Sequence, residues 1–332
     1  MMDWQQINEM IASSGRILLT SHENPDGDGL GSAVAMYHHL REKGKECRII
    51  NCSQLPEEYD FLNHDSIIEM YAAEEHDEWL KNCDLAIIFD VGAFSRLRGI
   101  KDAIDRYDIK TVNIDHHPHP DDHPFTINVV DTNAAATGAM VYDYLKEYRE
   151  KPLSKNICEG IYTAVMTDTG SFRYSNTNTK CHEIAIECLN AGVETSKIYQ
   201  RIYETKPQSS IRLLARVIEN ISFENDGELA WFSIDQNMLD AAEASSKDVD
   251  GFTDFIRTIK GVEVAVMVFE NGRDVCRINF RSQGKYVIND IAKHFGGGGH
   301  KFAAGAVIKG NKETIVPQVI SQTIASLERQ AA

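Results

Sequence analysis

Short apolar runs in this chain repeatedly stop at a carboxylate or a histidine-containing segment. The three clearest runs cover residues 17–20, 85–89 and 111–114. Because helical patterns separate them, they are typical of parallel strands that are buried on both faces of a sheet. The ligand crevice of an open α/β sheet lies at the carboxyl ends of its strands. We therefore expect an α/β fold in which a mainly parallel sheet has helices on both faces and a functional site at one edge.

The segment after the first run carries three candidate metal ligands. His22, Asp26 and Asp28 are close enough in sequence to converge from one turn. Gly27 and Gly29 let the backbone fold tightly enough to aim both carboxylates inward. A segment rich in Asn, Pro, Asp and Gly is also typical of a simple turn. The metal hypothesis therefore depends on the residues that follow the other runs.

The second and third runs end in the same residue types. Asp90 follows the second run, although a single aspartate there is also typical of a strand-end cap. Asp115, His116 and His117 follow the third run. Three titratable residues directly after a buried strand need polar partners, which a generic loop does not supply. These four residues are therefore candidates for a shared metal site.

One further aspartate, Asp168, follows a helix predicted over 154–166 and is expected in the turn 167–171. Carboxylate and imidazole groups at these spacings suit two adjoining coordination shells for divalent cations. Two such ions, about 3.5–4 Å apart, assist phosphate-ester hydrolysis by activating a water and neutralising the phosphoryl oxygens. The sequence therefore predicts a phosphoesterase.

The net charge restricts the partners of this site. The 332 residues include 34 Lys and Arg against 50 Asp and Glu, a formal charge of −16, which opposes attraction to a long polyanion such as duplex nucleic acid. A smaller phosphate substrate is compatible with this charge, because two divalent cations would cancel the four candidate carboxylates locally. We therefore expect substrate binding to require the metal.

Cysteine usage and hydropathy indicate the compartment. The seven cysteines are an odd number without the C-x-x-C spacing, so we expect reduced thiols rather than a disulfide framework or a thiolate zinc site. Residues 1–6 lack the features of a signal peptide, and no apolar run is long enough to span a bilayer. We predict a cytoplasmic protein with no membrane partner.

The carboxyl-terminal part has the features of a second, smaller α/β domain. Runs at 262–269 and 275–280 flank Asn271-Gly272, a strong hairpin signal. A helical segment that contains Pro207 precedes them. The predicted domains are a metal-binding domain at 1–190, a helical connector at 191–220 and a substrate-binding domain at 221–332. We expect the active-site cleft between the first and the last.

Four glycines, Gly296 to Gly299, precede His300 in this second part. They could form a flexible linker or stop a helix. Alternatively, their backbone N–H groups could bind an anion, with His300 as a further donor. Arg281 and Arg257 would add positive charge, although Arg257 could equally be a solvated helix residue.

The chain resembles the DHH family of phosphoesterases, which is named for the triplet Asp115-His116-His117. Its other family motifs are Ser21 to Asp28, Phe89-Asp90 and Thr167 to Gly170, and the glycine run resembles the signature of the DHH-associated domain. The resemblance implies one metal held by His22, Asp26 and Asp90. It implies a second metal, bridged to the first by Asp90, with the ligands Asp28, Asp90, His116 and Asp168.

The resemblance and the chemistry of the residues also suggest individual roles. Besides Asp90, the catalytic candidates are His117, for contact with the scissile phosphate or the leaving group, and Asp115, for orienting a ligand histidine or a water. The family uses the glycine run on nucleotide phosphate, which makes Gly297, Gly298, Gly299, His300, Arg257 and Arg281 candidates for substrate binding. Mixed imidazole and carboxylate ligation suits Mn²⁺, with Mg²⁺, Co²⁺ and Zn²⁺ as alternatives. Other histidines, among them His119, are interpreted as surface or packing residues.

The arrangement is most similar to stand-alone bacterial members of the family. These hydrolyse very short single-stranded RNA oligonucleotides to mononucleotides and dephosphorylate 3′-phosphoadenosine 5′-phosphate (pAp). A phosphodiesterase for cyclic or linear diadenylate, an inorganic pyrophosphatase, an exopolyphosphatase and a catalytically silent metal or nucleotide sensor remain alternatives. The apolar connector could form a homodimer or pack on its own domain.

Overall fold

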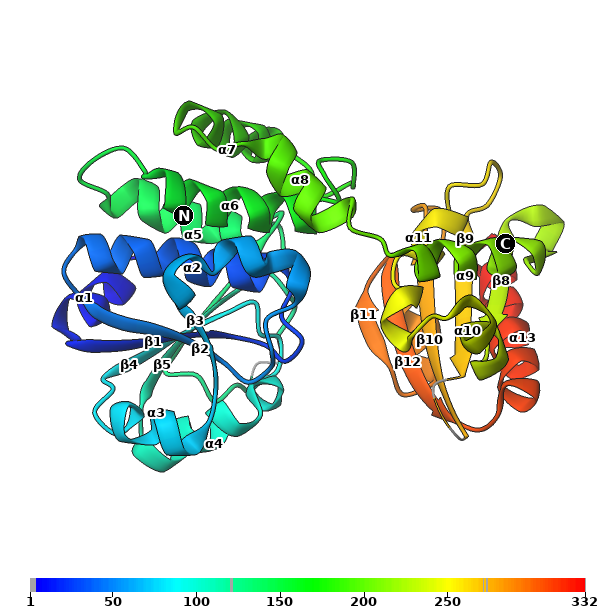
Figure 1. Ribbon diagram of the computed structural model, residues 1–332, viewed down its shortest axis with the longest axis horizontal. Coiled ribbons are helices and arrows are strands. Elements are labelled where there is room, and N and C mark those ends of the chain that lie inside the picture. Colours follow the sequence, from blue (N-terminus) through cyan, green and yellow to red (C-terminus); the bar gives the residue numbers. More distant parts are fainter. Residues whose placement is uncertain (1–3, 120–121, 271, 273, 332) are drawn as a thin grey trace. The chain divides into compact units, whose positions relative to one another are not determined.

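The computed structural model describes residues 4–119, 122–270, 272 and 274–331, so Met1 to Asp3 and Asn271 lie outside the described residues (Figure 1). The chain forms two compact units, Met1–Thr205 and Lys206–Ala332. The segment 191–220, expected as a separate connector, is divided between them. Helix α8 (Thr195–Tyr203) belongs to the first unit and α9 (Gln208–Glu219) to the second.

The first unit contains a six-stranded sheet in the order β3-β2-β1-β4-β5-β6, and every adjacent pair is parallel. The prediction of a mainly parallel sheet is confirmed. The strands are β1 (Arg16–Ser21), β2 (Glu46–Asn51), β3 (Ile68–Met70), β4 (Leu85–Phe89), β5 (Lys110–Asp115) and β6 (Ile127–Val130). Short helices η1 (Glu57–Leu62), η2 (His64–Ser66) and η3 (Phe94–Leu97) lie in the connections.

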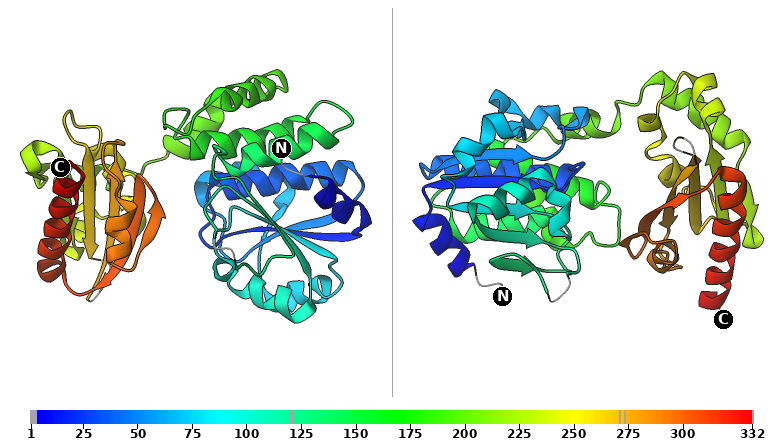
Figure 2. Two further views of the ribbon diagram at one scale, coloured as in Figure 1. Left: turned by 180° about the vertical axis from the view of Figure 1, so that it is seen from behind. Right: turned by 90° about the horizontal axis from the view of Figure 1, so that it is seen from below.

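Helices cover both faces of this sheet (Figures 1 and 2). Side chains alternate along β1, so Ile17 and Leu19 pack under one helical layer and Leu18 under the other. Both layers need apolar partners, which explains why the strands appear as continuous apolar runs. One layer holds α1 (Gln5–Ser13), α2 (Gly27–Glu42), α5 (Thr137–Tyr148) and α6 (Lys155–Asp168), and the other holds α3 (Ala73–Leu80) and α4 (Gly99–Tyr107).

Helices α2 and α6 pack with their backbones in close contact. A Cβ atom added to Gly31 would lie 2.3 Å from the Gly160 carbonyl oxygen, and one added to Gly160 would lie 2.5 Å from the Gly31 carbonyl oxygen. Only glycine permits this approach at both positions. The contact fixes the start of α2 and the end of α6, which both carry candidate ligands.

The helix predicted over 154–166 is confirmed but ends later than expected. Helix α6 continues to Asp168, which is its last residue rather than a residue of the following turn. The prediction stopped early because Thr167, Asp168 and Thr169 are weak helix formers, whereas in the fold Thr167 Oγ1 donates to the Thr163 carbonyl, 2.9 Å away. Helix α7 (Thr179–Asn190) follows.

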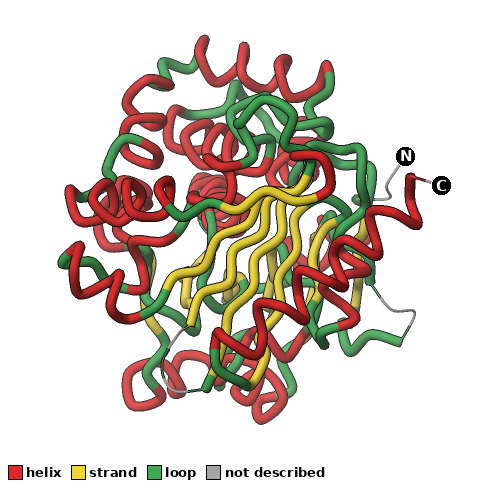
Figure 3. The backbone as a smooth tube through the Cα atoms, turned by 90° about the vertical axis from the view of Figure 1, so that its right-hand side faces the viewer, coloured by secondary structure: helices red, strands yellow, loops and turns green. Residues whose placement is uncertain are grey.

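The second unit is a mixed sheet in the order β11-β12-β10-β9-β8-β7. Strands β9 and β10 pair antiparallel on either side of the predicted hairpin, while β8 and β9 are parallel. Figure 3 shows α13 lying across this sheet; α12 packs in the same hydrophobic core as α13, whereas α9, α10 and α11 pack on the other face. The elements are α9, β7 (Ser222–Glu224), η4 (Asn225–Gly227), β8 (Leu229–Ile234), α10 (Gln236–Ala242), η5 (Ser246–Val249), α11 (Phe252–Ile256), β9 (Val264–Glu270), β10 (Val275–Ser282), α12 (Asn289–His294), β11 (Gly298–His300), β12 (Ala303–Lys309) and α13 (Lys312–Ala331).

Pro207 is the residue directly before α9. This is a position that proline tolerates, whereas in a helix interior it would break the helix. Among the residues that the structure describes, no helix is both long and apolar enough to cross a membrane.

Candidate metal centre

The candidate ligands gather where the strand order of the first sheet reverses. Strands β1 and β4 are neighbours, and the chain leaves them toward opposite ends of the sheet. In doubly wound sheets this switch point opens a crevice at the carboxyl ends of the strands. His22 directly follows β1, Asp90 directly follows β4, and Asp115 is the last residue of β5. The edge predicted from the sequence is therefore the edge at which these residues meet.

The first predicted ligand group is brought together by the fold. Atoms of His22, Asp26 and Asp90 lie close enough to hold one ion. His22 Nε2 is 3.8 Å from Asp26 Oδ1 and 3.4 Å from Asp90 Oδ2. Nδ1 of His22 lies 2.8 Å from the Glu23 carbonyl and 3.0 Å from Nη2 of Arg96. These contacts hold the ring so that Nε2 faces the two carboxylates, the orientation in which a histidine can bind a metal.

The second predicted group surrounds His116. Atoms of Asp28, Asp90 and His116 lie close enough to hold one ion. Nε2 of His116 is 3.7 Å from Asp28 Oδ2 and 3.6 Å from Asp90 Oδ1. It is also 3.7 Å from Asp168 Oδ2. Nδ1 of His116 lies 3.3 Å from the Ala134 carbonyl, so this ring also turns Nε2 toward the carboxylates.

These distances fit a shared cation better than a hydrogen-bonded cluster. An N–H···O hydrogen bond spans about 2.7–3.2 Å, whereas the His116 separations exceed that range. Asp28 and Asp90 are only 1% and 2% exposed, and buried carboxylates at this density need positive charge nearby. The donor set of imidazole and carboxylate suits divalent cations. The residues present therefore fit two metal ions that share Asp90.

The protonation of the carboxylates reflects this crowding. Burial and the carboxylates of Asp90 and Asp168 hold the pKa of Asp28 well above its ordinary value. Burial, together with Asp90, raises the pKa of Asp168 to about 7. Burial also opposes ionisation of Asp90, yet hydrogen bonds from His117 and His22 hold its pKa well below the ordinary range. Asp90 is therefore the permanent anion of the cluster.

We expect this crowding to make the metal-free protein less stable as the pH rises. The unfolded carboxyls titrate near a pKa of about 3.9. The raised folded-state values of Asp28 and Asp168 mean that the folded chain binds more protons between about pH 4 and pH 7. In EDTA, the melting temperature should fall by at least about 5 °C between pH 5 and pH 8. Saturating Mn²⁺ at pH 8 should restore it.

Asp168→Asn provides the matched control for this pH dependence, because it removes one of the raised carboxyls without changing the shape of the side chain. Its metal-free melting temperature should change less with pH than that of the wild type. An equal slope in the two proteins would contradict the assignment. Calorimetry across the same pH range measures both.

Asp90 occupies an unusual backbone conformation. Its φ is 63°, a left-handed value that costs most non-glycine residues about 1–2 kcal/mol and that aspartate and asparagine tolerate best. Its N–H donates to the Ile114 carbonyl, 3.0 Å away, which ties the end of β4 to β5. Strained residues of this kind are concentrated at functional sites. Here the conformation places the Asp90 carboxylate between His22 and His116.

Asp26 and Asp28 combine structural and ligand roles at the start of α2. Asp26 caps the helix, because its Oδ1 accepts hydrogen bonds from the N–H groups of Asp28 and Gly29 at 3.0 and 3.2 Å. The turn that the sequence suggested is therefore present alongside the ligand group. Gly29 is required by packing, since a Cβ atom there would lie 2.0 Å from Ser21 Oγ.

The structure adds Thr137 and Gly138 to the site. The N–H groups of Thr137 and Gly138, at the start of α5, donate to the two carboxylate oxygens of Asp28 at 2.7 and 2.8 Å. Thr137 Oγ1 also donates to Asp90 Oδ1, 3.1 Å away. Thr137 thus orients carboxylates of both ligand groups. The small residues 134–138, which lead into α5, are the sequence signal that could have indicated this close approach.

We expect the Thr137 hydroxyl to support metal binding. In Thr137→Val the backbone N–H to Asp28 and the shape are kept, but the hydrogen bond to Asp90 is lost. Loss of such an orienting contact typically weakens metal affinity or activity by about 10-fold to 100-fold. Thr137→Ser, which keeps the hydroxyl, should stay close to the wild type. Mn²⁺ titration calorimetry of both variants tests this, and equal affinities would contradict it.

His117 and Asp115 lie beside the ligand groups. Nδ1 of His117 donates to Asp115 Oδ1, 2.8 Å away, and lies 3.3 Å from Asp90 Oδ1. Burial alone would lower the pKa of His117, but these two carboxylates raise it to about 11. His119 Nε2 donates to the other oxygen of Asp115, 2.6 Å away. His119 was interpreted as a surface or packing residue rather than a ligand, and the structure places it, 5% exposed at its side chain, against Asp115 and outside both ligand groups.

The two predicted arginines of the second unit have partners within that unit. Arg281 Nε and Arg257 Nη2 lie 3.2 and 3.4 Å from the carboxylate of Asp254. Gly298 and Gly299, the last two glycines of the run, belong to a strand rather than a linker, since β11 pairs with β12. A Cβ atom at Gly297 would lie 2.1 Å from the Gly305 carbonyl oxygen. Its N–H donates to the Ala292 carbonyl, 2.9 Å away, so this amide is not directed at an anion.

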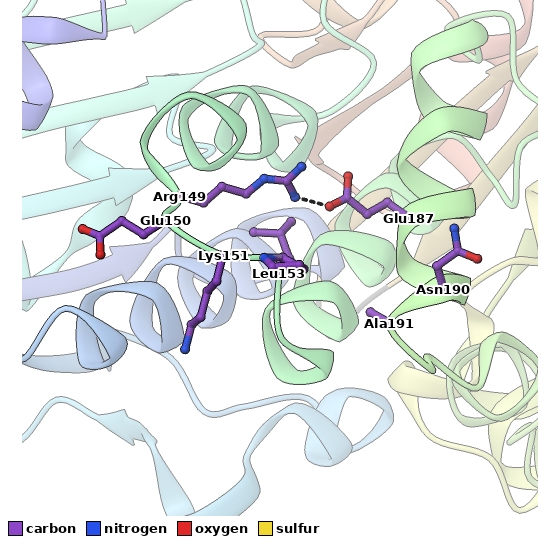
Figure 4. A pocket seen from close by; sticks show the side chains of 8 residues that line it. Arg149, Glu150, Lys151, Leu153, Glu187, Asn190 and Ala191 are labelled. Atoms are coloured by element: carbon purple, nitrogen blue, oxygen red, sulfur yellow. Dashed lines mark hydrogen bonds and ion pairs between the residues drawn. The ribbon is translucent and has the colours of Figure 1, made fainter.

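A separate hollow of about 560 Å³ lies near the far ends of α5 and α6 (Figure 4). It is lined by Arg149 and Glu187, which form an ion pair, and by residues 150–153. The start of α5 contacts Asp28 and the end of α6 carries Asp168, so this hollow lies at the opposite end of both helices. It contributes nothing to the metal centre.

Comparisons with known proteins agree with this geometry. The family model "DHH family, N-terminal domain" matches residues 16–165, and the "DHHA1 domain" model matches residues 235–326. The chain is 30% identical over 299 residues to the bifunctional oligoribonuclease and PAP phosphatase NrnA of Thermus thermophilus, with 90% of this chain and 86% of that protein covered. It is 29% identical to the Bacillus subtilis protein of the same name, with 88% and 89% covered. An exopolyphosphatase-related protein from Bacteroides fragilis has a similar structure, with a TM-score of 0.89, 27% identity, and 98% of this chain and 95% of that one covered.

Proposed function

The chain belongs to the DHH family of phosphoesterases, and from this premise we propose that it hydrolyses short single-stranded RNA oligonucleotides to mononucleotides and removes phosphate from pAp. The observation that carries the proposal is the pair of ligand groups that share Asp90. Two relatives that span most of this chain are named for both activities. A site that hydrolyses phosphodiesters and phosphomonoesters alike agrees with those names.

Two divalent ions, which we propose to be Mn²⁺ with Mg²⁺, Co²⁺ or Zn²⁺ as alternatives, would supply an activated water and neutralise the phosphoryl oxygens. His22, Asp26 and Asp90 would hold one. Asp28, Asp90, His116 and Asp168 would hold the other. The remaining chemistry is derived from the residues of the chain itself.

We assign His117 a role in acting on the substrate. Asp115 and Asp90 raise its pKa to about 11, which favours the protonated ring. Asp115 accepts the Nδ1–H at 2.8 Å, which fixes the ring and leaves Nε2–H as a donor. A cationic donor beside the scissile phosphate can hold a phosphoryl oxygen or stabilise charge that develops on the leaving oxygen. His119, through its hydrogen bond to Asp115, keeps the Asp115 carboxylate in position.

We also propose a division of labour between the two units. The first unit holds the metals, and the second supplies substrate contacts, with Gly298, Gly299, His300 and Arg281 as the residues for a distant phosphate. Arg257 remains a weaker candidate, because it donates to the Ser282 carbonyl at 2.9 Å as well as pairing with Asp254.

Initial rates on a substrate panel test the proposal. Metal-free protein is supplied with Mn²⁺ and given pAp, RNA two-mers and five-mers, a 24-mer, cyclic diadenylate, pyrophosphate and polyphosphate. Fast turnover of pAp and of the shortest RNAs, abolished in Asp168→Asn, is the expected result. Preference for cyclic diadenylate, pyrophosphate or polyphosphate would overturn the substrate while keeping the metal centre. Absence of any turnover would favour a metal or nucleotide sensor.

A further inference from the structure

A small pocket of about 250 Å³ opens directly beside the ligands Asp26 and Asp168. Its other walls include Tyr59, Tyr174 and Tyr203, and we call these three residues with Arg173 the tyrosine pocket. They come from three segments, namely η1, the loop between α6 and α7, and the last residue of α8. Segments far apart in sequence thus place three aromatic rings next to the metal centre.

Packing holds these rings in position. Tyr59 is only 8% exposed, and burial holds the pKa of its hydroxyl above the usual range. A Cβ atom at Gly170 would lie 2.4 Å from the Tyr174 ring, so the ring rests on this glycine, whose φ is +54°. The Tyr203 ring lies 5.0 Å from that of Tyr199, measured between centroids. Packing against neighbouring residues therefore fixes the positions of the three rings.

Two of the three rings remain accessible. Tyr174 and Tyr203 are 39% and 36% exposed, in contrast to the buried Tyr59. Arg173 is anchored, because its Nε donates to the Gly170 carbonyl at 2.8 Å. The pocket thus combines supported, accessible aromatic surface with one cation, at a point where two metal ligands form its inner wall.

We infer that the tyrosine pocket binds the base of the nucleotide whose phosphate is hydrolysed. This inference rests on the proposed function. It adds recognition of the base, which the two ligand groups cannot provide. Bases stack on aromatic side chains with little sequence preference, and each stack contributes roughly a 5-fold to 150-fold gain in affinity. The lining is suited to a nucleoside, since a polyphosphate would gain little from three tyrosines and a single arginine.

The pocket therefore separates nucleotides from inorganic phosphates. A metal centre recognises any phosphoryl group, whereas an adjoining aromatic pocket contributes only when a base is attached. Because stacking is tolerant of base identity, all four bases should be accepted. This is the tolerance that a hydrolase of mixed short RNAs needs.

The test compares substrates with and without a base. The rate constant kcat/KM is measured for pAp and for ribose 3,5-bisphosphate, which carries the same two phosphates without adenine. The wild type should prefer pAp by about 5-fold to 150-fold. Tyr174→Leu should reduce this preference toward one, and Tyr174→Phe, which keeps the ring, should retain it. A preference that is equal in the wild type and in Tyr174→Leu would overturn the inference.

A binding measurement separates this inference from the proposed function. Titration calorimetry with Ca²⁺ in place of Mn²⁺ compares adenosine 5′-monophosphate with ribose 5-phosphate in the same three proteins. If pAp and RNA were not hydrolysed, the proposed function would fail, yet a base-dependent affinity lost in Tyr174→Leu would still support the pocket. Base-independent affinity in the wild type would overturn the pocket even if RNA were hydrolysed. Melting temperatures confirm that each variant is folded.

Discussion

Asp90→Asn is expected to lower kcat/KM on pAp and short RNA by at least about 1000-fold, which corresponds to a loss of about 4 kcal/mol of transition-state stabilisation. Asp90 belongs to both ligand groups, so one substitution weakens both metal sites. Its strongly lowered pKa makes it the anion that is present at every working pH. Calorimetric titration with Mn²⁺ should show fewer than the two bound ions expected of the wild type.

The asparagine variant should remain folded, which separates a chemical effect from a structural one. Asparagine tolerates the left-handed φ of 63° and can still accept the hydrogen bond from Thr137. Asp90→Ala would add backbone strain and is therefore a poorer test. Asp102→Asn, an exposed aspartate of α4, is the matched control and should keep full activity. Retention of wild-type activity in Asp90→Asn would exclude the shared-ligand arrangement.

Gly160→Ala is expected to destabilise the protein by about 2 kcal/mol. At an uncrowded helical position the same change would stabilise by about 1 kcal/mol through helix propensity. At Gly160 the new methyl group would lie 2.5 Å from the Gly31 carbonyl oxygen and 2.9 Å from the Ala35 nitrogen. Both contacts are backbone atoms, which cannot move aside as a side chain would. Helices α2 and α6 must therefore separate.

Urea unfolding measures this change, and Asn156→Ala, at an exposed position of the same helix, controls for propensity. The separation of α2 from α6 should also move Asp28 away from Asp168, so Mn²⁺ affinity should fall together with stability. A Gly160→Ala protein as stable as the wild type would show that the helix contact is looser than described.

The candidate ligands could be predicted from local sequence because their order along the chain reflects the order of the strands. Each apolar run needs burial on both faces, and each polar residue after it lies at a strand end. His22, Asp90 and Asp115 could be assigned to one edge for this reason, and the structure places them there. The glycine run was harder to interpret, because glycine suits linkers, anion sites and close strand packing alike. The pairing of β11 with β12 excluded the linker, and phosphate binding by Gly298 and Gly299 stays a proposal.

Tertiary packing determined how the ligands are held and what surrounds them. Thr137 donates to Asp28 although the two residues are 109 positions apart in the sequence, and no local sequence pattern relates them. The contact of His119 with Asp115 and the meeting of Tyr59, Tyr174 and Tyr203 depend in the same way on how loops cross the sheet edge. The order of residues along the chain predicts which side chains bring charge to the edge of the sheet, because continuous apolar runs end directly at titratable residues. Only the folded chain decided their orienting partners, because those partners come from segments that approach one another only through long-range packing.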